Sequence, residues 1–104
     1  MKLVQFKLLT IICEPVLSSK ILTLSKAHGA TGFTLTEVSG EGSGEKSSGE
    51  IPLLKMKIEI VVDLELAEKL MEVLAKTYFQ NYSVITYVID ISVMRPEKFE
   101  SLKS

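Results

Sequence analysis

The feature that most constrains the fold is an apolar run that extends from Leu3 to Cys13 and stops just before Pro15. The polar residues that interrupt it are Gln5, Lys7 and Thr10. Its densest part, residues 8–13, is too short to form a helix of its own and predicts a central β-strand that is buried on both faces. Pro15 suits the first turn of a following helix, because the N–H that proline lacks would have no partner there.

Two stretches carry apolar residues at helical spacing. The first runs from Pro15 to Gly29, a residue type that often ends helices. Its stripe consists of Leu17, Ile21, Leu24 and His28. The second begins after Asp63, whose carboxylate can cap it. Its predicted core face consists of Leu64, Ala67, Met71, Leu74 and Tyr78. The solvated face is predicted to carry the i,i+4 ion pairs Glu65–Lys69 and Glu72–Lys76.

Three further stretches favour strands. Residues 33–38 alternate in polarity and include two threonines, and residues 56–62 alternate between apolar and charged side chains. Residues 82–94 place apolar side chains on both faces of a last strand. Residues 40–52, between the second and third predicted strands, are rich in glycine and serine and predict a flexible loop.

The element order β-α-β-β-α-β predicts a single α+β domain over residues 1–104 with a ferredoxin-like fold. In this fold two helices cover one face of a four-stranded antiparallel sheet, and right-handed crossovers place the first and third strands in the middle. The flexible loop covers about residues 40–52 and a charged tail about residues 96–104. The other sheet face keeps apolar side chains from the first and last strands, which predicts self-association through that face.

Charge and cysteine usage exclude several classes. The net charge is −1 and Arg95 is the single arginine, which argues against nucleic-acid binding through the phosphate backbone. No apolar run reaches the ~18–20 residues of a membrane span and no cleavable signal is apparent, so a cytoplasmic location is expected. Cys13 is the single cysteine and is interpreted as a buried, inert thiol, with neither an internal disulfide nor a multi-cysteine metal site.

The sequence contains no catalytic motif, so the chain is predicted not to be an enzyme. His28 lies on the apolar face near the end of the first helix and is interpreted as a partly buried helix-end residue. Glu14 lies at the junction between the first strand and the first helix. It is interpreted either as a functional acid or as a residue that caps the helix and contributes only local charge.

The loop has chemistry suited to oxyanions. Glycine N–H groups, serine hydroxyls and a lysine can all face an anion. The residues are Gly42, Ser43, Gly44, Lys46, Ser47 and Ser48. The connection is longer than the usual two to five residues of a hairpin, which is typical of functional loops. It does not match the Walker A pattern, and three acids oppose anion binding, so a plain flexible linker is the alternative.

Several segments together resemble the PII-like signalling proteins, in particular the regulators associated with bicarbonate transport and carboxysomes. The segments are 29–34 (Gly-Ala-Thr-Gly-Phe-Thr), 40–43 (Gly-Glu-Gly-Ser), 47–50 (Ser-Ser-Gly-Glu), 57–60 (Lys-Ile-Glu-Ile), 67–68, 75–87 and 97–99. The resemblance covers nearly the whole chain in one register. It implies a trimer with nucleotide clefts between subunits. It also implies an effector such as AMP, ADP, ATP or cyclic AMP, with no further cofactor required. Nucleotide binding would order the loop, which in turn controls contact with a membrane transporter or another protein partner.

Position by position, the resemblance implies that Gly32, Phe33 and Thr34 line the nucleotide cleft. It assigns Gly42, Ser43 and Ser47 to the phosphate side of the loop. Similar proteins carry two arginines in this loop, whereas this chain reads Gly-Ser-Gly-Glu-Lys-Ser over residues 42–47. Lys46 is the candidate replacement for the second arginine, although a lysine cannot reproduce bidentate contacts to phosphate.

Two alternatives stay open. The missing arginines and the added acid are compatible with a trimeric interaction protein that has lost nucleotide sensing. A metal-binding trimer of the same fold is the other alternative, and with one histidine and one cysteine it would need carboxylate ligands.

Overall fold

A computed structural model describes residues 2–41 and 53–100 of the chain. The elements run in the order β1 (Val4–Cys13), a 3-10 helix η1 (Pro15–Leu17), α1 (Ser18–Ala27), β2 (Thr34–Gly40), β3 (Leu53–Val62), α2 (Leu64–Tyr78), β4 (Ile85–Val93) and a second 3-10 helix η2 (Pro96–Lys98). The predicted βαββαβ order is confirmed.

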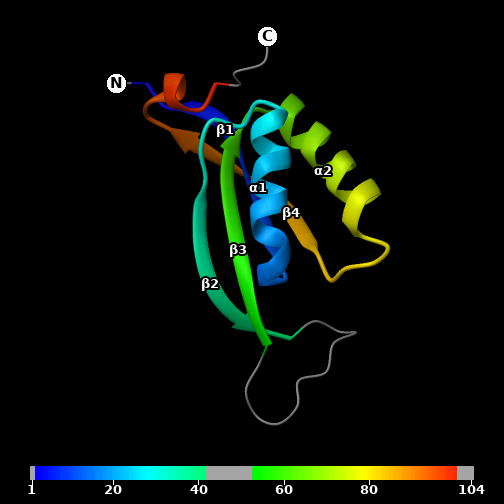
Figure 1. Cartoon of the computed structure of the whole chain (residues 1–104). Coiled ribbons are helices and arrows are strands. Elements are labelled where there is room, and N and C mark those ends of the chain that lie inside the picture. The colour runs from blue at the N-terminus through cyan, green and yellow to red at the C-terminus, as the bar shows by residue number, and fades with distance from the viewer. Residues whose placement is uncertain (1, 42–52, 101–104) are drawn as a thin grey trace.

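The four strands form one sheet in the order β2-β3-β1-β4, and every neighbouring pair is antiparallel. The first and third strands therefore occupy the middle of the sheet, as the crossover rule predicts. Both helices lie on the same side of the sheet (Figure 1). The other side is called the open face below. This is the ferredoxin-like fold that the sequence predicts.

The hydrophobic core lies between the helices and the sheet. Its strand residues alternate along β1 and β3, because successive side chains point to opposite faces. The core residues of the sheet are Leu9, Ile11, Cys13, Ile58, Ile60 and Val62. The helices close the core with Leu17, Ile21, Leu66, Ala67, Leu70, Leu74 and Tyr78. Cys13 is a free thiol and is buried, as predicted.

Several local signals act as predicted. The Asp63 side chain accepts a hydrogen bond of 2.8 Å from the backbone N–H of Leu66 and caps α2. Gly29 follows α1 with a φ of 111°, a conformation that a side chain would disfavour. The Glu72–Lys76 ion pair forms on the exposed side of α2, with 3.0 Å between nitrogen and oxygen.

The predicted core face of α2 is wrong at its first position. Leu64 is 55% exposed, and the buried face instead includes Leu66 and Leu70. Both residues belong to a stripe that is rotated relative to the predicted one. Leu64 directly follows the capping residue and lies at the edge of this rotated stripe, so its side chain stays exposed.

Several strand boundaries also differ from the sequence expectation, and β3 begins at Leu53 rather than at residue 56. β2 continues to Gly40, two residues beyond the predicted end. β4 begins at Ile85 rather than at residue 82. Tyr82 instead belongs to a turn, because its backbone N–H donates to the carbonyl oxygen of Tyr78 at 3.0 Å.

The C-terminal segment folds back over the sheet. After β4 the chain forms η2, and the ring of Phe99 packs edge-on against Phe6 with 6.1 Å between the centroids. The Thr31 hydroxyl donates a hydrogen bond of 2.9 Å to the carbonyl oxygen of Lys98. This segment, residues 96–99, therefore joins the end of β4 to the start of β2, and it is called the C-terminal strap below. Across residues 2–41 and 53–100, no helix has the length and apolar character needed to span a membrane.

Candidate functional site

The open face is more apolar than a solvent-facing sheet surface usually is. Strand alternation places Ile85, Tyr87 and Ile89 on it, and these side chains are 49%, 43% and 50% exposed. They pair with Ile12, Thr10 and Leu8 of β1, which face the same way. The sequence expectation of an apolar open face is confirmed.

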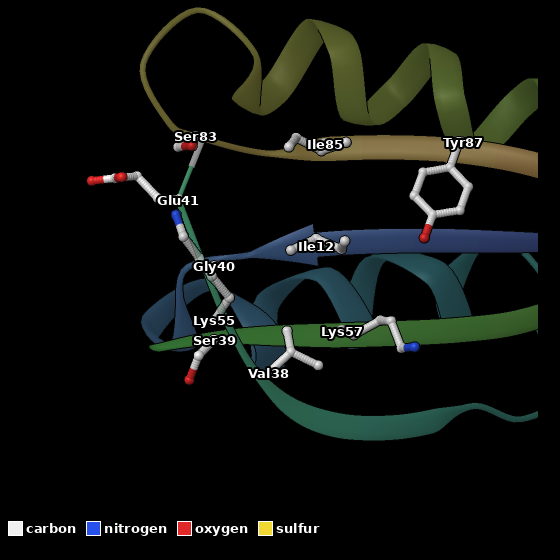
Figure 2. Close-up of a pocket in the computed structure, with 10 residues that line it drawn as sticks. All are labelled: Ile12, Val38, Ser39, Gly40, Glu41, Lys55, Lys57, Ser83, Ile85 and Tyr87. Atoms are coloured by element: carbon white, nitrogen blue, oxygen red, sulfur yellow. The ribbon is translucent and has the colours of Figure 1, made fainter. Parts of the chain in front are cut away.

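A hollow of about 380 Å³ lies on this face, where β2 ends and β4 begins (Figure 2). Side chains from all four strands contribute to it, and it is called the loop-base pocket because β2 leads from it into residues 42–52. Its lining residues are Ile12, Val38, Ser39, Gly40, Glu41, Lys55, Lys57, Ser83, Ile85 and Tyr87.

Two lysines supply the positive charge of the loop-base pocket. Met56 and Ile58 of β3 point into the core, so alternation places Lys55 and Lys57 on the open face. Lys55 is only 6% exposed, which is unusual for a lysine. Figure 2 shows both lysines extending from β3 over the open face. An anion placed here would meet these two ammonium groups in surroundings of reduced water access.

Glu14 connects the end of β1 to the wall of this pocket. Its carboxylate accepts a hydrogen bond of 3.4 Å from the backbone N–H of Ser83. Burial raises the pKa of the Cys13 thiol above its ordinary value; the Glu14 carboxylate raises it further, and the Lys55 ammonium opposes both. Glu14 and Lys55 therefore shift the pKa of Cys13, the last residue of β1, in opposite directions.

A second hollow, of about 170 Å³, lies where β2 begins, between that strand and the C-terminal strap. It is called the strap pocket. Its lining residues are Thr31, Gly32, Phe33, Thr34, Glu59, Val61, Lys98 and Phe99. The structure thus brings together Gly32, Phe33 and Thr34, which the sequence assigns to the nucleotide cleft.

The details of the strap pocket distinguish these three residues. A Cβ built on Gly32 would meet nothing within 4 Å in this chain, so the chain itself leaves that space open. The Phe33 ring lies under the ammonium group of Lys26, 5.0 Å from its centroid, which ties the ring to the last turn of α1. Thr34, the first residue of β2, pairs with Glu59 on the open face.

The other predicted site residues, Gly42, Ser43, Lys46 and Ser47, lie outside the described residues. Sequence reasoning missed the contributions of Lys55, Lys57 and Ser83. The alternation of β3 was a signal for the two lysines, because it places them opposite the core residues. No sequence signal indicated Ser83. His28 caps the end of α1 and is partly buried, as expected. Within the part of the chain that the structure describes, no group of three or more His, Cys, Asp or Glu side chains could hold a metal ion.

Comparison with known proteins decides the family. Residues 6–98 match the family model described as nitrogen regulatory protein P-II. The chain belongs to the P-II family. The P-II match begins within β1 and ends with η2, so it includes the loop-base pocket and all of the strap pocket except Phe99.

Solved structures of PII-like proteins superpose on this chain closely. A PII-like signalling protein from Thermus thermophilus is 36% identical, with a TM-score of 0.81 over 95% of this chain and 99% of that one. CPII from Thiomonas intermedia, bound to ADP, AMP and acetate, is 30% identical, with a TM-score of 0.84 over 97% and 100% of the two chains. CPII bound to ADP and bicarbonate is 34% identical, with a TM-score of 0.81 over 94% and 97%. This chain is accordingly a PII-like regulatory protein, and P-II proteins act in signalling.

Proposed function

We propose that this chain is a nucleotide-responsive regulator that binds an adenine nucleotide between the subunits of a homotrimer and acts without catalysis. One observation carries the proposal. Two hollows lie at opposite ends of the open sheet face, and the strap pocket holds the three cleft residues that the PII-like resemblance assigns. The Thiomonas relative was solved with ADP and AMP bound, which supports an adenine nucleotide as the effector.

The size of the strap pocket argues for a site shared between subunits. Its volume of about 170 Å³ is below the ~300–1,000 Å³ typical of ligand pockets. The half-exposed side chains of Ile85, Tyr87 and Ile89 form an apolar surface that a second and third copy can cover. We infer that trimer formation through the open face brings the strap pocket of one subunit to the loop-base pocket of its neighbour.

Charge assigns roles to the two halves of this site. The lysines of the loop-base pocket, Lys55 and Lys57, are proposed to face the phosphates. Lys98 in the strap pocket adds a third ammonium group. Gly32, Phe33 and Thr34 are proposed to contact the nucleoside. Gly42, Ser43, Lys46 and Ser47 follow the loop-base pocket along the chain and are proposed to complete the phosphate contacts.

The position of the loop-base pocket supports a switch. Gly40 and Glu41 line the pocket and lead directly into the long connection between β2 and β3. A nucleotide that contacts them can set the conformation of that connection. We propose that the connection then controls a protein partner, namely a membrane transporter, with a bicarbonate transporter as the first candidate. The protein itself is proposed to be cytoplasmic and to reach the membrane through that partner.

Thermal unfolding with each nucleotide tests the proposal. AMP, ADP, ATP and cyclic AMP are added separately, each with and without bicarbonate, because CPII was solved with ADP and bicarbonate together. A ligand at 100 times its dissociation constant adds about 2.7 kcal/mol to the free energy of unfolding. We expect a clear rise in melting temperature with at least one nucleotide. No rise at millimolar concentration, together with no heat in calorimetry, contradicts the proposal.

A second function has its own support in the sequence. The segment from Gly44 to Lys46 carries an acid and no arginine, which favours a trimeric interaction protein without nucleotide sensing. A pull-down of the partner distinguishes the two functions. Recovery of the same partner in equal amount with and without nucleotide favours the interaction protein, whereas recovery that changes with nucleotide favours the regulator.

A further inference from the structure

Glu14 occupies a special place at the end of β1. Its backbone is still extended, with φ −64° and ψ 142°, although β1 ends at the preceding residue. Because Cys13 points into the core, alternation turns the Glu14 side chain to the open face. Glu14 therefore lies on the face that carries both pockets, immediately beyond the last paired residues of the central strand.

The strand register places Glu14 between two residues that line the loop-base pocket. Cys13 pairs with Met56 of the antiparallel strand β3 on one side. One step further along β1 and one step back along β3, Glu14 therefore lies beside Lys55. Ile12 pairs with Ile85 on the other side, and continuing that register sets Glu14 beside Ser83. The hydrogen bond from the Ser83 N–H to the Glu14 carboxylate, 3.4 Å long, agrees with this placement.

The result is a negative charge next to the most buried positive charge of the pocket. Lys55 is 6% exposed and Glu14 is partly buried, so water screens their fields less than at the surface. Glu14 raises the pKa of the Cys13 thiol and Lys55 lowers it, which agrees with the placement of both charges near the end of β1. An anionic ligand in the loop-base pocket would be attracted by Lys55 and Lys57 and repelled by Glu14 and by Glu41, an acid that itself lines the pocket.

We propose that Glu14 is a specificity-determining residue that limits the negative charge of the ligand in the loop-base pocket and so favours AMP over ATP. This inference rests on the proposed function, because it takes the phosphates to face Lys55 and Lys57. Each added phosphate brings negative charge toward the same carboxylate. The repulsion therefore grows from AMP to ADP to ATP, whereas the adenosine part is the same in all three.

Two substitutions separate charge from hydrogen bonding. Glu14→Gln removes the charge and keeps a side-chain oxygen that can accept from the Ser83 N–H. Glu14→Ala removes both. If Glu14 only holds the Ser83 segment in place, Glu14→Gln should bind nucleotides like the wild type. Glu14→Ala should then lower the affinity for AMP, ADP and ATP by the same factor. If the charge selects the ligand, both variants change the ratio of the ATP and AMP affinities.

A matched control is Glu37→Gln, which makes the same change in net charge. Glu37 is exposed and pairs with Met56, so it faces the helix side of the sheet rather than the pockets. Any change in affinity caused by overall charge appears in this variant as well. A change confined to the Glu14 variants is a local effect.

The experiment is isothermal titration calorimetry of AMP, ADP and ATP, without divalent metal, with the wild type and the three variants at low and high salt. We expect Glu14→Gln to strengthen ATP binding at least about fivefold more than AMP binding, and the difference to shrink as salt rises. Glu37→Gln should keep the wild-type ratio. Nucleotide binding by the wild type with an unchanged ATP-to-AMP ratio in both Glu14 variants overturns this inference and leaves the proposed function intact. Absence of nucleotide binding by the wild type overturns both.

Discussion

The Thr31 hydroxyl lies 2.9 Å from the carbonyl oxygen of Lys98 and donates a hydrogen bond to it. The two residues are far apart in the sequence, and both line the strap pocket. This bond and the Phe6–Phe99 ring contact both hold the C-terminal strap to the open face.

Loss of the Thr31 hydroxyl should loosen the strap. Thr31→Val keeps the shape of the side chain and removes the donor, which costs about 1 kcal/mol of unfolding free energy. If nucleotide occupies the strap pocket, its affinity falls as well. Thr23→Val is the control, since Thr23 donates a similar bond of 2.9 Å to Ser19 within α1, away from both pockets. Urea denaturation and calorimetry measure the two effects. Equal nucleotide affinity in Thr31→Val and Thr23→Val contradicts a role for the strap in binding.

Gly32 offers a test of the strap pocket that does not disturb the fold. The added methyl group of Gly32→Ala meets no atom of the same chain within 4 Å, and a compatible glycine-to-alanine change stabilises by about 0.4–1 kcal/mol. Unfolding free energy should therefore stay level or rise. A nucleotide or neighbouring subunit that fills this space would meet the methyl group, and affinity should fall about tenfold. Unchanged affinity in calorimetry would show that nothing packs against Gly32.

The apolar open face predicts the oligomeric state. Ile89 is 50% exposed at the centre of β4, and Ile89→Asp should release folded monomers because a charge cannot be buried unpaired at a subunit contact. Leu64→Asp is the matched control: Leu64 is 55% exposed, but it lies at the start of α2 in the helix layer. Light scattering at micromolar concentration should give a trimer for the wild type and for Leu64→Asp. A monomeric wild type excludes the trimer.

Cys13 gives the stability a pH dependence at the alkaline end. Burial raises the pKa of its thiol above the ordinary value of 9.0, with a further contribution from Glu14. In the unfolded chain the thiol ionises near that ordinary value, whereas the folded chain keeps it neutral. This contribution to stability is therefore complete below about pH 9 and is lost as pH rises through the raised pKa. Urea titrations from pH 7 to pH 10 should show a smaller loss of stability in Cys13→Ala than in the wild type. Parallel curves for the two proteins would contradict this contribution.

The sequence was sufficient for the fold because its patterns were unambiguous in the central strands. The apolar run ending at Cys13 and the alternation from Met56 to Val62 each allow only one assignment, and both strands lie in the middle of the sheet. The face of α2 was harder, because leucines lie on more than one side of that helix. Leu64 and Leu66 are equally apolar, and only the position of the sheet decides that Leu66 is buried.

The candidate site was predictable only in part, for a geometric reason. Gly32, Phe33 and Thr34 are consecutive, so a resemblance along the chain is sufficient to find them. Lys55 and Ser83 line one pocket only because three strands pair, and pairing registers follow from the assembled sheet rather than from local spacing.

The position of β1 has a consequence for how this protein is made. Of the four strands of this sheet, β1 is synthesised before the others, yet its partner on one side, β4, is synthesised after the other three. Until then the central strand has one unpaired edge, and such an edge is a template for pairing with other chains. Contacts between the two ends of a chain also slow folding, since the loop between them closes before the contacts stabilise it. This edge of β1 therefore stays open to pairing with other chains until β4 has been synthesised and has paired with it.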